Sequence, residues 1–252
     1  MSKPGQPDRF PPVAGPAAAG QRRSWKAGVL AAVFSLAALP AIAMEPFTAD
    51  YQANYMGMKA TGTMTLAPAG NDRWKYSLDI DGMGAKLGQS TVFESRGGEW
   101  RPLSSTDSQQ GTGGLAALLV KRKRVDATYD WSTGQARWTG DVKDGRAGPV
   151  ALKSGDVDAM LLNLMLVRDV KAGKPLSYRL VEDGRVRKQT YKVAGTESID
   201  VGGRQRQATK VVRDDGKRQI LAWIVEGLPV PARILQRRDG KDQVDLKLKS
   251  VR

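Results

Sequence analysis

Polar and apolar residues alternate along much of this chain. From Phe47 to Tyr55 every second residue is apolar, and the same alternation recurs over 60–66 and 73–80. Alternation of period two places one face of a β-strand against a core and the other face in solvent. The pattern therefore predicts three half-buried strands, and the Pro68–Asp72 segment supplies turn residues between the last two.

The second half of the chain repeats this scheme. Alternating residues over 125–131 and 136–138 predict two strands, and later strands are expected around Tyr178, Tyr191, Val211, Leu221, Ile234 and Leu246. Asp-Gly and Gly-Gly pairs, which favour tight hairpins, separate most of these later strands. We expect a mainly β fold: a curved antiparallel meander sheet, or a partly open barrel, of about ten or more strands.

One segment breaks the alternation. Ala159–Val167 is apolar on nearly every side, which predicts one buried helix near residues 156–170, inside the curve of the sheet. Ser154 or Asp156 is expected to cap its N-terminus, and Gly173 with Pro175 to end it.

A second apolar stretch, 115–120, is interpreted as a short helix or a lip over the sheet, and four cations follow it: Lys121, Arg122, Lys123 and Arg124. Apolar and cationic residues side by side suit contact with an anionic surface. The plainer interpretation is a strand that begins with solvated charges.

The N-terminal region has the pattern of a secretory signal peptide over about 22–43. Basic residues at 22, 23 and 26 precede a 13-residue apolar run, Ala27–Leu39, and a small-x-small ending predicts cleavage after Ala43. The run is short for a membrane span, so cleavage is favoured over an uncleaved anchor. Residues 1–21 are expected to be disordered, and residues 44–252 to form a single β-rich domain in the periplasm. General secretion and twin-arginine export both remain open.

Composition narrows the chemistry. The chain has no histidine and no cysteine, which excludes histidine-based triads, cysteine nucleophiles and metal sites built on these residues. The net charge is +14, and residues 44–252 retain +10. In an exported protein such a charge points to anionic envelope components rather than to nucleic acid. No catalytic, cofactor-binding or metal-binding residue is predicted.

Three acidic pairs, Asp79/Asp81, Asp156/Asp158 and Asp214/Asp215, have the composition of a cation site or an acid–base pair. Positions on a polar strand face, at a helix cap and in a turn explain them more simply. Gly82–Gly88 has one residue too many for a dinucleotide-binding loop and is interpreted as a hairpin. The tryptophans at 74, 100, 131, 138 and 223 are expected to pack in the core.

Several segments resemble one bacterial family in their order and spacing. They are Phe47–Tyr51, Trp100–Pro102, Lys123–Trp131, Asp158–Leu164, Asp214–Arg218 and Leu228–Leu235. Over residues 46–250 the chain is similar to the domain-of-unknown-function 3108 family of exported envelope proteins. This resemblance implies a curved antiparallel sheet with little helix, and it brings no catalytic residues.

The leading functional hypothesis is a non-enzymatic periplasmic protein that binds a lipid or another apolar or anionic envelope component. An envelope protein-interaction or structural module that pairs through an exposed strand edge is the second hypothesis. A carboxylate-based hydrolase is the third. The alternation of residues is the same for a filled and for a hollow interior.

Overall fold

A computed structural model describes residues 44–55, 57–82, 84–112 and 120–252. These residues form sixteen strands and the helix α2. The elements are β1 (Phe47–Tyr55), β2 (Met58–Pro68), β3 (Arg73–Gly82), β4 (Ala85–Arg96), β5 (Glu99–Gly111), β6 (Lys123–Asp130), β7 (Gln135–Gly140), β8 (Val150–Ala151), β9 (Asp156–Val157), α2 (Ala159–Lys171), β10 (Ser177–Glu182), β11 (Arg185–Thr190), β12 (Lys192–Val201), β13 (Arg204–Asp214), β14 (Arg218–Val225), β15 (Arg233–Arg238) and β16 (Lys241–Val251).

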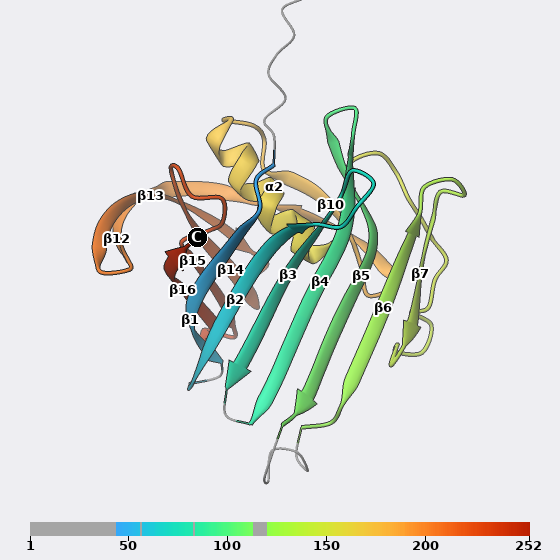
Figure 1. Cartoon of the computed structure of the whole chain (residues 1–252), viewed down its shortest axis with the longest axis horizontal. Coiled ribbons are helices and arrows are strands. Elements are labelled where there is room, and N and C mark those ends of the chain that lie inside the picture. Colours follow the sequence, from blue (N-terminus) through green and yellow to red (C-terminus); the bar gives the residue numbers. More distant parts are fainter. Residues whose placement is uncertain (1–43, 56, 83, 113–119) are drawn as a thin grey trace, which may run out of the picture. The chain divides into compact units, whose positions relative to one another are not determined.

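Thirteen of these strands form one antiparallel sheet (Figure 1), in the order β12-β13-β14-β15-β16-β1-β2-β3-β4-β5-β6-β7-β8. Sequence neighbours pair throughout, except where β16 pairs with β1 and places the last strand beside the first. The sheet ends at β12 and β8 and does not close into a barrel. The prediction of a mainly β, curved antiparallel sheet is confirmed, and its open form is the one observed.

The register places apolar residues in rows across one face of the sheet. Ala53 pairs with Leu246, which pairs with Ile234, and all three are buried. On the other face Thr63 lies opposite Asp50, and the Thr106 hydroxyl donates to Asp126 at 2.6 Å. We call these the inner and the outer face. This division is the consequence of the alternation in the sequence.

Helix α2 packs against β3, β4 and β10 and fills part of the inner side of the sheet (Figure 1). Its buried residues are Met160, Leu161, Leu162, Leu164, Leu166, Val167 and Asp169. Each large apolar side chain contributes about 1.5–3 kcal/mol by leaving water, so this helix is held firmly. Arg168 and Lys171 lie in its last turn, where their positive charges interact favourably with the negative end of the helix dipole.

The helix cap differs from the prediction. Asp158 caps α2 by accepting from the Leu161 amide at 2.8 Å, whereas Ser154 and Asp156 lie before the helix. Asp156 pairs in parallel with Arg179 of β10, and its carboxylate binds the Arg179 guanidinium and the Lys153 amide. Asp156 therefore has backbone and side-chain partners that keep it in β9, and the helix begins three residues later, at Ala159.

The strand expected around Tyr191 is in fact two strands. β11 ends at Thr190 in a three-stranded sheet ordered β11-β10-β9, and β12 begins at Lys192 in the large sheet. Tyr191 lies between them, donates its amide to the Leu176 carbonyl at 2.8 Å, and packs its ring against Tyr178. Alternation continues across this change of sheet, which is why the sequence shows no break.

Strand β14 is buried on both faces over Leu221–Val225, although alternation predicts one buried face per strand. The β12–β13 hairpin curls towards β16, and a Cβ on Gly202 would lie 2.4 Å from the Lys249 carbonyl oxygen. Glycine is needed at this contact. Under this curl Trp223 is 3% exposed and donates its indole N–H to Glu197 at 2.5 Å.

Candidate functional site

The basic run 121–124 lies at one end of the sheet, and its two residues within β6 belong to opposite faces. Lys121 and Arg122 are exposed and precede β6. Arg124 lies on the outer face, where its guanidinium binds the Asp126 carboxylate at 2.8 Å and lowers the pKa of that carboxyl. Lys123 lies opposite Gln109 on the inner face, near Asp107; burial raises the pKa of Asp107, and Lys123 opposes that rise. Within the described chain, only Arg124 of the four has an ion pair.

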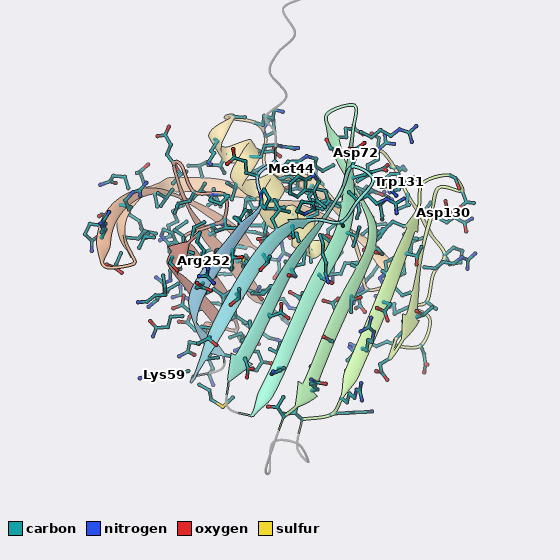
Figure 2. All side chains as sticks on the ribbon, in the orientation of Figure 1. Met44, Lys59, Asp72, Asp130, Trp131 and Arg252 are labelled. Carbon is teal, nitrogen blue, oxygen red and sulfur yellow. The ribbon has the colours of Figure 1, made fainter. Side chains whose placement is uncertain are left out.

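Two further lysines join this run at the same end of the sheet. In an antiparallel meander the β1–β2, β3–β4 and β5–β6 connections lie at one end, which places Lys59 and Lys86 near the run. Figure 2 shows Lys59 at this end of β2. Lys86 pairs with Asp81 at 3.1 Å, and the Met58 side chain beside Lys59 is 41% exposed. We call Lys59, Lys86, Lys121, Arg122, Lys123 and Arg124 the basic rim.

Sequence analysis recovered four of these six cations and missed Lys59 and Lys86. Both are single lysines beside a turn, and no local motif distinguishes them. The signal was available in the topology, because alternate turns of a meander share one end of the sheet. The apolar stretch 115–120 falls largely outside the described residues, as do the signal peptide and its cleavage point after Ala43.

At the opposite end of the sheet, several carboxylates have partners in or beside the turns. Asp130 accepts from the Ser132 hydroxyl and from the Ser132 and Thr133 amides of its turn, and these bonds lower its pKa to about 2. Glu99 pairs with Arg101 at 3.2 Å and also accepts from the Ser154 hydroxyl. Asp72 and Asp130 mark this end in Figure 2. These carboxylates are therefore held by partners in their turns, whereas Lys59, Lys121 and Arg122 of the basic rim have no carboxylate partner within the described residues.

Each acidic pair has a structural role. Asp81 pairs with Lys86 beside the β3–β4 hairpin, and Asp215 accepts from the Arg218 amide at 2.8 Å in its turn. Asp158 caps α2, as described above. In the part of the chain that the structure describes, no group of three or more acidic residues has an arrangement that could hold a metal ion.

Two hollows flank the sheet. An open hollow of about 400 Å³ lies over the outer face of β1 and β2, lined by Asp50, Gln52, Thr61, Thr63 and Lys249 among others. A second one, of about 20 Å³, lies on the inner side at the start of α2. Asp50 in the larger hollow binds the Arg252 guanidinium, which lowers the pKa of its carboxyl. The larger hollow is open to solvent, whereas the smaller one is narrow.

Fold and rim together define an open, curved antiparallel β-sheet protein with one helix on its inner side and a basic end. The family model described as "Protein of unknown function (DUF3108)" matches residues 50–247, and the chain belongs to this family. The resemblance seen in the sequence is thereby confirmed. No curated protein matches the chain. None of the described helices has the length and hydropathy of a membrane span.

Solved structures that match this chain have low sequence identity to it. A beta-barrel-like protein of domain of unknown function DUF1849 from Brucella abortus has 13% identity and a TM-score of 0.50, covering 82% of this chain and 96% of that one. The structure of MucB has 11% identity and a TM-score of 0.35. The Pseudomonas aeruginosa MucA/MucB complex has 12% identity and a TM-score of 0.37. This chain spans about half of the MucB chains, at 53% and 51%.

Proposed function

We propose that this protein is exported to the bacterial envelope and docks reversibly, without catalysis, on an anionic envelope surface through its basic rim. The observation that carries this proposal is the gathering of six cations, from β2, β4 and the approach to β6, at one end of the sheet. The signal-peptide pattern of 22–43 and the +10 charge of residues 44–252 support the location.

The expected binding is weak and salt-sensitive. Lys59, Lys121 and Arg122 are exposed and have no carboxylate partner within the described chain. A basic residue near an anionic membrane contributes about 1 kcal/mol, so these three supply about 3 kcal/mol. The exposed Met58 side chain adds apolar contact at the same place. Binding of this strength suits a reversible encounter and not a permanent anchor.

The rim is preferred to the interior as the contact site because α2 occupies the inner side of the sheet. Leu161 and Leu166 are at most 2% exposed, and the hollow beside the helix holds about 20 Å³. An acyl chain would have to displace these side chains, at a cost of about 1.5–3 kcal/mol for each large one. Contact of lipid head groups with the basic rim is therefore favoured over binding of an acyl chain on the inner side of the sheet.

Co-sedimentation with vesicles tests the proposal. Wild-type protein is expected to bind vesicles that contain phosphatidylglycerol and not those of phosphatidylcholine alone. The triple variant K59E/K121E/R122E should bind at least tenfold more weakly. The matched control R73E/R96E/R204E changes three exposed arginines at the opposite end of the sheet. Equal losses in both triple variants would reduce the effect to net charge and overturn a role for the rim.

The strand edge of β12 supports a second candidate, an envelope protein-interaction module. β12 is the last strand of the large sheet, and its Val193 side chain is 61% exposed. An open edge can add a strand from a partner protein. A photo-crosslinker at Thr196 should then capture one specific envelope protein, while the same group at Thr128 on the outer face of β6 should not. Absence of any specific product at Thr196 would count against this candidate.

A further inference from the structure

Three carboxylic acids from separate parts of the chain line the hollow of about 20 Å³ beside α2: Asp107 of β5, Asp158 at the helix cap and Glu182 at the end of β10. Gln89 and Tyr129 line it as well. The Gln89 amide donates to Asp107 at 2.7 Å, and Tyr129 donates its hydroxyl to the Val181 carbonyl at 3.2 Å. We call this hollow the carboxyl pocket.

Asp158 has one oxygen without a hydrogen-bond donor in this pocket. The residue is 3% exposed, and its Oδ1 accepts from the Leu161 amide at 2.8 Å, whereas Oδ2 has no partner within the described chain. Thr91 is close enough to lower the pKa of Asp158, yet its hydroxyl donates to the Ser104 carbonyl at 3.2 Å. A buried carboxylate oxygen without a donor is costly, so this position is suited to a ligand that donates.

The neighbouring charges do not neutralise the pocket. Burial raises the pKa of Asp158 to about 7, and Glu182 and Asp107 add to this rise. Burial also raises the pKa of Glu182. Arg187 of β11, whose guanidinium binds Glu182 at 2.5 Å, partly opposes this rise. Burial raises the pKa of Asp107 too; nearby Lys123 on β6 opposes this rise, and Asp183 in the β10–β11 turn adds to it. Glu182 therefore has a cation partner in Arg187, whereas Asp158 has none within the described chain.

We propose that the carboxyl pocket binds the primary ammonium group of a small molecule, with Asp158 Oδ2 as the innermost acceptor and Glu182 and Asp107 at its mouth. A primary ammonium group carries three donors and a positive charge, which suits the unpartnered Asp158 Oδ2 and the two further carboxyls that line the hollow. The volume of about 20 Å³ accommodates a group the size of one water molecule. A trimethylammonium group is several times larger and is excluded by size.

Thermal unfolding at pH 8 tests the proposal with methylammonium chloride and ethanolamine as probes. At tenfold excess over its Kd, either amine should raise the Tm by about 3–6 °C. Tetramethylammonium and sodium chloride at the same ionic strength should have no such effect. At pH 5 Asp158 is protonated, so the stabilisation by amines should disappear, because a neutral carboxyl attracts the ammonium group less.

The variant D158N should lose the response to amines and keep its fold, because asparagine caps helices as well as aspartate does. The matched control D81N changes a carboxylate that is 56% exposed at the basic rim, and it should respond as wild type does. The proposal is overturned if methylammonium is no better than tetramethylammonium or sodium, or if D158N responds like wild type. The comparison of pH 5 with pH 8 in wild type decides the matter even if D158N does not fold.

Discussion

The basic rim and the interior carboxyls leave charges unpaired in two different settings. At the rim, Lys121 and Arg122 stand in water, where an unpaired charge costs little and salt screens its field. Inside, Asp158 is 3% exposed, and its Oδ2 has no hydrogen-bond partner within the described chain. There an unpaired charge costs several kcal/mol, and its pKa changes instead.

This contrast separates two kinds of behaviour within one chain. The rim should respond to ionic strength, because its exposed cations stand in water where salt screens them. The carboxyl pocket should respond to pH and be nearly indifferent to salt, because buried groups are screened poorly. Substitutions at the two places should therefore affect different measurements.

The largest effect is expected when the partner of a buried carboxylate is removed. Arg179→Met leaves Asp156 buried without its guanidinium, and the free energy of unfolding should fall by roughly 3 kcal/mol. The lower end of the usual range applies because the Arg179 side chain is 30% exposed. Lys86→Met, which breaks the exposed pair with Asp81, should cost less than about 0.5 kcal/mol. If urea unfolding shows equal losses of stability for the two variants, the difference between buried and exposed ion pairs is contradicted.

The next effect is the pH dependence of stability. The pKa of Asp158 rises from 3.8 to about 7 on folding, so the folded state holds its proton more tightly than the unfolded state does. Stability should therefore be highest near pH 4 and decrease as the pH rises to 7, by an amount on the order of 4 kcal/mol. Carboxyls with lowered pKa values, such as Asp126 and Asp130, change the stability only at pH values below about 4.

Asp158→Asn should flatten that profile between pH 4 and pH 7, because no group titrates at the cap. The variant should then be more stable than wild type at pH 8. Asp158→Ala should also flatten it but lose about 1 kcal/mol at every pH through the missing cap. A steep profile that persists in both variants would place the titration elsewhere.

The smallest effect concerns salt. Raising the ionic strength from about 0.05 M to about 0.5 M shortens the screening length severalfold, and vesicle binding through three exposed cations should weaken about tenfold. The Tm should change little over the same range. Binding that persists in high salt but fails when Met58 is replaced by serine would identify an apolar contact as the main one.

Much of the fold was predictable because its signal is local. Alternation over 47–55 gave the bounds of β1, and the apolar run at 159–167 gave α2. The change of sheet at Tyr191 was not predictable, since residues on both sides of it remain extended. The burial of both faces of β14 was missed for a related reason: it depends on how the preceding β12–β13 hairpin folds back, where Trp223 donates to Glu197, and alternation within one strand does not encode this.

The candidate sites were predictable from sequence only where their residues are consecutive. The run 121–124 was visible as consecutive cations, but its division between two faces depends on the register of β6 with β5. Asp158 was noted as one of an acidic pair, whereas its neighbours in the pocket, Asp107 and Glu182, are far from it in the sequence. Only the folded chain brings three such residues together.

The central claim, that the basic rim is the end that meets an anionic surface, can be tested directly because the chain has no cysteine. An environment-sensitive dye is attached after Lys59→Cys in one sample and after Asp72→Cys in another, at the two ends marked in Figure 2. With phosphatidylglycerol vesicles, emission of the dye at position 59 should shift to the blue, while emission at position 72 should not change. A shift at position 72 alone, or equal shifts at both, would contradict the claim.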